Sequence, residues 1–202
     1  MAKLGGLSAA ADTLRTAKRV LVAACGTAYL AGKIGEYMLE EYAGIPVKAD
    51  IASEFRYRKP VFRDGDILLA VSQSGETADT LAAIREAKEK GIPTFGIVNA
   101  VGSTIARETD AGVYQHVGPE IGVASTKAFT SQVTIMALLT MFLGRQRDMS
   151  LVTGERIAKE LQRIPDLIRT ILSQRPAIAD LAGKYRRYKN FFFLGRKYNL
   201  PV

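Results

Sequence analysis

The sequence predicts an α/β protein: a three-layer, doubly wound parallel sheet of about five strands, followed by helices. Short apolar segments alternate with amphipathic helical ones along the chain, which is the pattern of parallel α/β sheets. The first segment, 19–25 (RVLVAAC), is apolar almost throughout, as expected for a parallel strand that helices cover on both faces. Gly44 and Gly91 follow two helical patterns at positions where glycine commonly ends a helix.

The elements follow in a regular order. The predicted strands are 19–25, 46–52, 66–72, 93–99 and a weaker one at 111–118. The predicted helices between and after them are 28–44, 77–91, 103–110 and 125–147. The last helix is apolar nearly all round in its middle, so we expect it to be buried.

The character of the chain changes after residue 148. The segment 149–189 has helical periodicity interrupted by Pro165 and Pro176, which predicts a helical connector. Another strand of the buried type, NFFFLGR, begins at residue 190. We therefore expect three parts, the domain 1–148, the connector 149–189, and 190–202 as the opening strand of a second α/β unit that is cut short.

The composition excludes several classes of protein. Apolar residues make up 48% and charged residues 24%, which is typical of soluble globular domains. We find no apolar run near the ~20 residues of a membrane span and no signal-peptide pattern, so a cytoplasmic protein is expected. Cys25, the single cysteine, excludes an intramolecular disulfide, and His116, the single histidine, leaves little scope for zinc. We expect neither a metal nor another cofactor.

The net charge of +8 raises the question of nucleic-acid binding. Basic residues gather in two short segments, 56–63 and 184–189, and elsewhere they mix with acidic residues on helix faces. No nucleic-acid motif accompanies them, and the tyrosines are not spaced as stacking platforms. We therefore do not expect a nucleic-acid partner, and an anionic small molecule suits the charge equally well.

Three predicted strand ends are polar: 25–28 (CGTA), 72–77 (SQSGET) and 122–126 (GVAST). In open α/β sheets, ligands bind outside the carboxyl ends of the strands, next to the helices that follow. Because parallel strands all end at the same edge, we expect these three segments to lie near one another.

The segment 72–77 is the most informative of the three. It holds three hydroxyl side chains, Ser72, Ser74 and Thr77, together with the amide of Gln73, directly before a helix. Unpaired N–H groups at a helix start favour an anion, and short hydroxyl donors suit the several oxygens of a phosphate. The alternative is that Ser74 or Thr77 only caps the helix, which would explain one hydroxyl but not three. The pattern is neither a P-loop nor a dinucleotide fingerprint.

Other candidate groups are weaker. A nucleophilic Cys25 would need His116 as its base, but that histidine lies within a strand pattern, where a structural role is more common. Glu120 is a loop carboxylate that we expect to be solvated. Lys127 lies just inside a helix start, an unfavourable place for a cation unless an anion binds nearby, so it supports an anion site.

Six segments together resemble one family. They are ACGTA, IASEFRYR, SQSGETADTL, GSTIARETD, GPEIGVASTKAFTSQ and FLGR. In this order they are similar to the isomerase part of the glutamine–fructose-6-phosphate aminotransferases, which is built from two sugar isomerase (SIS) folds. The resemblance implies that this chain is the first SIS fold, the connector and the start of the second. It also implies the sugar-phosphate contacts, which are Ser72, Gln73, Ser74, Thr77, Thr27, Cys25, Val123 and Ser125.

The resemblance also sets limits. Ala28 stands where many members have serine, and Lys197 where glycine is common. Members of the family convert fructose 6-phosphate and glutamine to glucosamine 6-phosphate and glutamate, and they are dimers. The catalytic residues belong to the second SIS fold and the glutaminase domain, so we expect a sugar-phosphate-binding chain without turnover. The alternatives are a non-enzymatic SIS-fold sensor of sugar phosphates and a stand-alone sugar-phosphate isomerase.

Overall fold

The computed structural model describes residues 4–122 and 125–202. Its centre is a parallel sheet in the order β2-β1-β3-β4-β5. The strands are β1 (Arg19–Ala24), β2 (Val47–Ile51), β3 (Asp66–Ser72), β4 (Thr94–Val98) and β5 (Ala111–Tyr114). The chain starts in the interior of the sheet, steps outward to β2, and then returns past β1 to build the other side. This is the doubly wound α/β topology that the sequence predicted.

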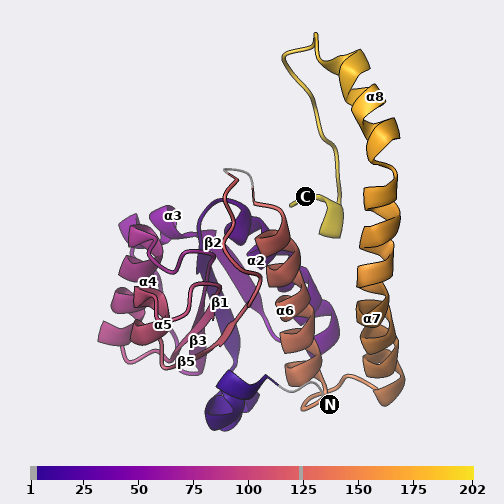
Figure 1. Cartoon of the computed structure of the whole chain (residues 1–202). Coiled ribbons are helices and arrows are strands. Elements are labelled where there is room, and N and C mark those ends of the chain that lie inside the picture. The colour runs from indigo at the N-terminus through magenta and orange to yellow at the C-terminus, as the bar shows by residue number, and fades with distance from the viewer. Residues whose placement is uncertain (1–3, 123–124) are drawn as a thin grey trace.

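Helices cover both faces of this sheet (Figure 1). The first face carries the 3₁₀ helix η1 (Gly5–Ala10) with α1 (Ala11–Thr16), α2 (Gly26–Ala43) and α6 (Lys127–Gly144). The second face carries α3 (Ala52–Tyr57), α4 (Ala78–Glu89) and α5 (Thr104–Glu108). Each face buries its own apolar cluster, so the predicted three layers are confirmed.

The strand ends explain one difference from the predicted ranges. The fifth strand was expected to run over 111–118, but β5 ends at Tyr114. His116 has a φ of +54°, a left-handed conformation that a strand does not accommodate. The chain turns there and leads across the carboxyl edge of the sheet towards α6.

Helix α6 is buried, as its apolar composition predicted. It packs along α2, and Gly35 permits this close approach, because a Cβ there would lie 2.7 Å from the sulfur of Met136. Among the described residues, α6 is the one helix long and apolar enough to cross a membrane, and 56% of that window is buried inside the fold. Such burial is typical of the core helix of a folded domain.

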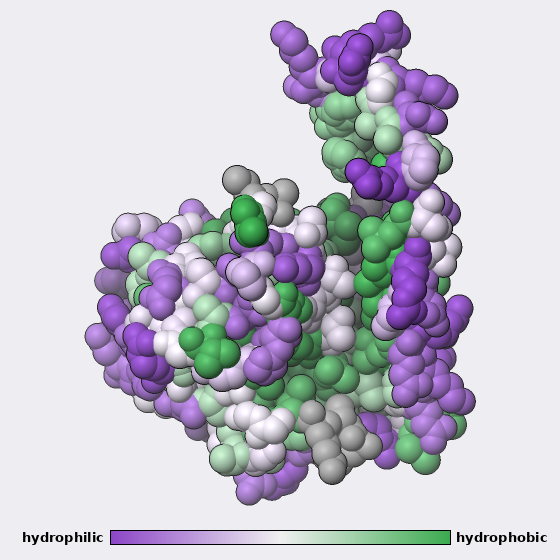
Figure 2. Space-filling model, in the orientation of Figure 1, coloured by the Kyte–Doolittle hydropathy of each residue, from purple (hydrophilic) through white to green (hydrophobic). Residues whose placement is uncertain are grey.

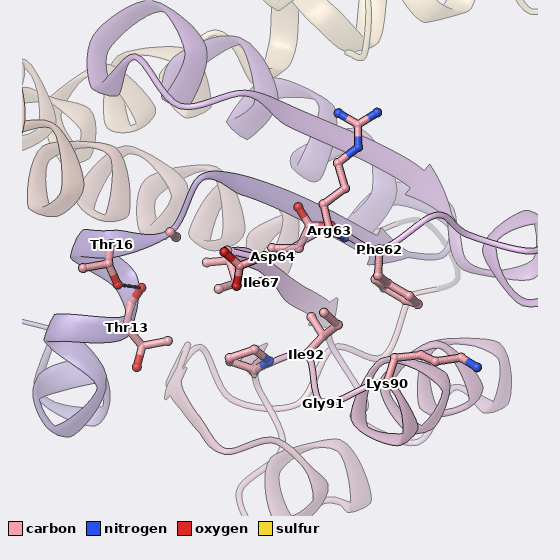
Figure 3. Close-up of a pocket in the computed structure, with 13 residues that line it drawn as sticks. Thr13, Thr16, Phe62, Arg63, Asp64, Ile67, Lys90, Gly91 and Ile92 are labelled. Carbon is pink, nitrogen blue, oxygen red and sulfur yellow. Dashed lines mark hydrogen bonds between the residues drawn. The ribbon is translucent and has the colours of Figure 1, made fainter.

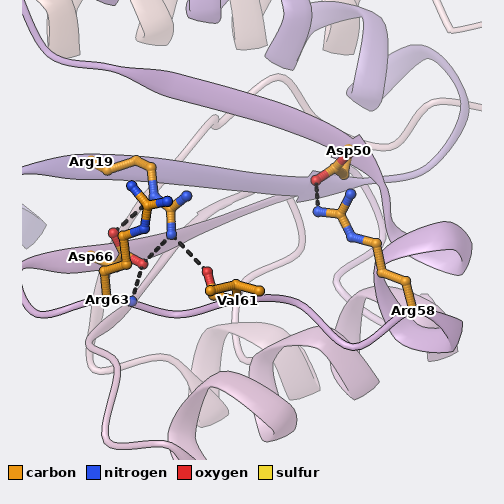
Figure 4. Close-up of polar contacts among 6 residues, drawn as sticks. All are labelled: Arg19, Asp50, Arg58, Val61, Arg63 and Asp66. Carbon is orange, nitrogen blue, oxygen red and sulfur yellow. Dashed lines mark hydrogen bonds and ion pairs between the residues drawn. The ribbon is translucent and has the colours of Figure 1, made fainter.

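Ion pairs anchor the segment between α3 and β3 (Figure 4). Arg19 donates from Nε to Asp66 Oδ1 at 2.9 Å and from Nη2 to the carbonyl of Val61 at 2.8 Å. The backbone N–H of Arg63 donates to the same Asp66 carboxylate at 2.7 Å. Further along, Arg58 pairs with Asp50. Part of the basic cluster at 56–63 is therefore paired internally.

The C-terminal region is helical and extends away from the sheet (Figure 1). It consists of α7 (Leu151–Ser173), α8 (Arg175–Tyr185) and the 3₁₀ helix η2 (Lys197–Asn199). Ser150 caps α7 by accepting a hydrogen bond from the N–H of Thr153 at 3.1 Å. Pro165 was expected to interrupt this helix, but it lies inside α7, whereas Pro176 lies in the first turn of α8.

Residues 190–196 form no strand in this chain, contrary to the sequence prediction. Phe192 and Phe193 are 96% and 87% exposed, so the apolar run has no sheet to join. A strand needs a neighbour to pair with its backbone groups. After this segment the chain returns to α2, where Lys197 Nζ and Tyr198 Oη both donate to Glu41 at 2.9 Å.

The side of α7 turned towards the sheet domain is apolar. Figure 2 shows hydrophobic surface along this side. An open groove of about 1230 Å³ separates it from α6 and β5, with Leu161, Ile164 and Ile168 on its α7 wall. The connector is thus an amphipathic helix whose apolar face is only partly covered by this chain.

Candidate functional site

A small pocket lies at the carboxyl edge of β1 and β3, where α2 and α4 begin. Its volume is about 210 Å³. Its lining comprises Cys25, Thr27, Ala28, Val71, Ser72, Gln73, Ser74, Thr77, Glu120, Gly122, Ser125 and Gln132. The structure thus brings together every sequence-predicted site residue except Val123, which lies outside the described residues.

The two serines of the segment 72–77 shape its turn. Ser72 Oγ accepts a hydrogen bond from the N–H of Gly75 at 2.9 Å, and Ser74 Oγ accepts one from Glu76 at 3.3 Å. Each hydroxyl uses a lone pair in these bonds and keeps its own proton for donation. Thr77 is the N-cap residue of α4, but its side chain makes no capping bond. The capping alternative therefore does not account for Thr77.

The turn is fixed against α5 through Gly75. Its φ is +69°, and its carbonyl accepts a hydrogen bond from the N–H of Ile105 at 2.9 Å. A Cβ at this position would lie 2.0 Å from Ser103 Oγ, so only glycine fits. Glu76 accepts a hydrogen bond from the N–H of Thr104 at 2.8 Å, and bonds from Thr104 hold the pKa of this carboxyl below its ordinary value. The acidic residue of the loop thus binds α5 and does not line the pocket.

The first strand end contributes Cys25 and Thr27. Cys25 is half-buried at the N-cap of α2, with its sulfur 4.0 Å from Thr80 Oγ1. His116 lines the apolar groove instead of this pocket, so no Cys–His pair forms. Ala28 lines the pocket wall, so the hydroxyl that many family members carry there is missing from the wall itself.

The third polar segment was predicted to be a strand end, but β5 ends at Tyr114, so Ser125 and Thr126 belong to the loop before α6. Glu120 organises this loop. Its Oε2 accepts a hydrogen bond from Ser125 Oγ at 2.9 Å, and its Oε1 accepts bonds from the N–H of Thr126 at 2.8 Å and from Thr126 Oγ1 at 3.0 Å. The backbone bond from Thr126, with smaller help from the hydroxyls, lowers the pKa of Glu120. We expected a solvated carboxylate. Glu120 is in fact partly exposed, and its carboxylate also holds Ser125 at the pocket.

Sequence reasoning missed Gln132, which is 1% exposed and lies on α6. The sequence signal that could have indicated Gln132 was a single amide side chain within an otherwise apolar helix. Lys127 was expected to support the anion site, but it lines the groove and not the pocket. The pocket therefore offers neutral donors, and none of its described lining residues is a lysine or an arginine.

A second cavity, of about 540 Å³, lies at the amino edge of the sheet (Figure 3). Thr13, Arg63, Asp64 and Lys90 are among its lining residues. Asp64 already pairs with Lys18 at 2.9 Å. Open α/β sheets bind ligands at the opposite, carboxyl edge, where the helix N-termini point inward. The small pocket is therefore the candidate site.

Fold and site together define the class of protein. A family model described as "SIS domain" matches residues 13–142, and this chain belongs to that family.

Curated relatives of high similarity agree with the resemblance that the motifs indicated. Over 98% of its length the chain is 52% identical to a glutamine–fructose-6-phosphate aminotransferase [isomerizing] of Chlorobaculum tepidum, covering 32% of that protein. The corresponding protein of Thermus thermophilus is 48% identical over 93% of the chain, covering 31% of its own length. The chain thus spans about a third of these curated relatives.

A solved structure extends the comparison to three dimensions. It is the C-terminal domain of a glucosamine-fructose-6-phosphate aminotransferase from Francisella tularensis, with a TM-score of 0.93 and 35% identity. The match covers 96% of this chain and 55% of that one. Nearly the whole chain, including the helical region after the sheet, therefore has the arrangement seen in that domain.

Proposed function

We propose that the chain is the sugar-phosphate-binding part of a glutamine–fructose-6-phosphate aminotransferase, an enzyme of amino-sugar biosynthesis. Residues 1–148 would form its first SIS domain, 149–189 a helical connector, and 190–202 the opening of a second SIS domain. The exposed side chains of Phe192 and Phe193 support this division, because a following domain would bury them. We further propose that the enzyme is a cytoplasmic homodimer.

One observation carries the binding proposal. The hydroxyls of Ser72, Ser74 and Thr77 line one pocket with Thr27 and Ser125, although these residues come from the ends of β1 and β3 and from the loop before α6. A hexose 6-phosphate would place its phosphate against the hydroxyls of the 72–77 loop and the first N–H groups of α4. The helix dipole and the orphan N–H donors favour an anion there. The hydroxyls add hydrogen bonds without adding charge.

The same lining supports the absence of turnover. Isomerising a sugar phosphate moves a proton between neighbouring carbons, so a base must reach the substrate. Among the described pocket residues Glu120 is the one carboxylate, there is no histidine, and both Glu120 oxygens already accept hydrogen bonds. We propose that the catalytic groups come from parts of the enzyme outside this chain.

Calorimetry tests the binding proposal directly. Fructose 6-phosphate and glucosamine 6-phosphate are titrated into the chain and into its Ser74→Ala and Thr77→Val variants. We expect binding by the unsubstituted chain and an affinity about threefold to tenfold lower in each variant, the value of one neutral hydrogen bond. Thr13→Val is the matched control, because Thr13 lines the cavity at the amino edge.

Two results would contradict the proposal. One is the absence of binding by the unsubstituted chain. The other is equal affinity in all four proteins, which would leave the 72–77 loop without a role. Formation of glucosamine 6-phosphate from fructose 6-phosphate and ammonia by this chain would contradict the proposed absence of turnover.

A further inference from the structure

Gln132 is a buried polar side chain whose carbonyl oxygen has no hydrogen-bond partner among the described residues. Its residue is 1% exposed, and its Oε1 atom is buried with no hydrogen-bond partner. It lies in the second turn of α6, a helix whose other buried side chains are almost all apolar. Leaving a buried carbonyl oxygen unpaired lowers the stability of a fold, so such atoms are rare and commonly mark a functional position.

The position of Gln132 indicates which kind of group its amide could bind. Its side chain lines the same pocket as the hydroxyls of Ser72, Ser74 and Thr77. Those three groups come from the 72–77 loop, whereas Gln132 comes from α6, on the other side of the pocket from α4. The pocket therefore has donors where the phosphate would bind and an unpaired acceptor contributed by a different element.

Glu120, the other acceptor side chain near Ser125, is already engaged by the chain itself. Both its oxygens accept hydrogen bonds from Ser125 and Thr126, which fixes the carboxylate in place. The Oε1 atom of Gln132, by contrast, accepts no hydrogen bond within the described chain, so its acceptor capacity remains for a ligand hydroxyl. Phosphate oxygens at neutral pH only accept hydrogen bonds, so this acceptor would not attract them.

We infer that Gln132 is a specificity-determining residue that accepts a hydrogen bond from a hydroxyl of the sugar part of the bound sugar phosphate. This inference rests on the proposed function and deepens it. The 72–77 loop binds the phosphate, and Gln132 forms a hydrogen bond with the polyhydroxylated part of the ligand. A molecule with a phosphate but no hydroxyl donor at that distance would leave the amide unpaired and bind less well.

Gln132→Met tests this inference, because methionine has a similar length and removes the acceptor. Affinity for fructose 6-phosphate is measured by calorimetry, and the midpoint of thermal unfolding without ligand is measured in parallel. We expect the affinity to fall about threefold to tenfold, the value of one neutral hydrogen bond. The unfolding midpoint should stay unchanged or rise, since an unpaired buried oxygen has been removed.

Gln146→Met is the matched control. Gln146 follows the same helix and donates from Nε2 to the carbonyl of Phe142 at 2.9 Å, away from the pocket. The same substitution there should leave the affinity for fructose 6-phosphate unchanged and lower the unfolding midpoint slightly. We thus expect Gln132→Met to lower affinity without loss of stability, and Gln146→Met to lower stability without loss of affinity.

The outcomes separate the inference from the function beneath it. If the unsubstituted chain binds fructose 6-phosphate and Gln132→Met binds it equally well, the inference is wrong and the proposed function stands. If Gln132→Met lowers the unfolding midpoint together with the affinity, the amide has a structural role and the inference is again wrong. If the unsubstituted chain does not bind the sugar phosphate, the proposed function fails and the inference fails with it.

Discussion

Replacing Gly75 with alanine should disrupt the 72–77 loop for two separable reasons. The residue has a φ of +69°, which L-amino acids with a Cβ rarely adopt. The added Cβ would also lie 2.0 Å from Ser103 Oγ, 2.4 Å from Ser103 Cβ and 2.8 Å from Val98 Cγ1. Real Cβ atoms do not approach other atoms so closely, so the loop, the start of α5 or both must move.

The magnitude follows from these two contributions. A left-handed conformation at a residue with a Cβ destabilises the fold by roughly 1–2 kcal/mol. Forcing an extra carbon into a packed site adds about 1–3 kcal/mol. Ser103 and Val98 are themselves buried, so neither can move freely aside. The free energy of unfolding should therefore fall by about 2–5 kcal/mol, a large share of the roughly 5–15 kcal/mol of a typical domain.

Gly91→Ala separates the two contributions. Gly91 has a φ of +70°, nearly the same as Gly75, but a Cβ there would meet nothing within 4 Å. This variant should lose only the backbone contribution, about 1–2 kcal/mol. The difference between the two variants then measures the contact of the 72–77 loop with Ser103.

Urea unfolding at equilibrium provides the assay, with calorimetric titration of fructose 6-phosphate alongside. We expect Gly75→Ala to unfold at lower urea than Gly91→Ala and to bind the sugar phosphate less tightly. Equal unfolding midpoints for the two variants would refute the contact argument. Tight binding by Gly75→Ala would show that the loop does not need this geometry.

Three further predictions concern charged groups. Arg19→Met leaves the buried carboxylate of Asp66 without its charged partner, with only the N–H of Arg63 still donating to it. The free energy of unfolding should therefore fall by about 3–5 kcal/mol in a urea titration, and a loss under 1 kcal/mol would contradict this. Glu41→Gln removes the ionised acceptor of Lys197, so limited proteolysis near the C-terminus should become faster. Because the bond from Lys197 lowers the pKa of Glu41, acidification should also make cleavage of the unsubstituted chain faster. Cleavage of the unsubstituted chain at the same rate at every pH would contradict this prediction. Glu120 also has a lowered pKa, so its charge stabilises the fold at pH values above the ordinary carboxyl pKa of about 4.3. The unsubstituted chain and Glu120→Gln should therefore differ in their unfolding midpoint at neutral pH. This difference should vanish as the pH falls through the lowered pKa of Glu120.

Local patterns in the sequence predicted most of the fold. The strands β1, β3 and β4 are apolar runs that stay buried on both faces, and α6 is a core helix as its composition indicated. Periodicity and apolar runs depend on neighbouring residues only, so one sequence suffices to recognise them. The 72–77 loop was found for the same reason, since its hydroxyls are adjacent in the chain.

Residues 190–196 mark where local patterns fail. Their apolar run predicts a buried strand, but strand formation depends on a neighbouring strand that accepts and donates the backbone hydrogen bonds. In this chain the segment has no such neighbour, and its phenylalanines remain exposed. The end of β5 is a second case, because the left-handed turn at His116 reflects the path of the chain rather than any local signal.

The sequence by itself determined the α/β class, the buried strands and the hydroxyl-rich loop, because each depends on residues that are close together along the chain. Only the tertiary structure decided how the pocket is completed. Glu120 fixes Ser125 and Thr126 through hydrogen bonds, and Gln132 contributes an unpaired carbonyl oxygen from α6. Hydrogen-bond partners and burial depend on which elements the fold brings side by side, and local sequence patterns do not determine which elements these are.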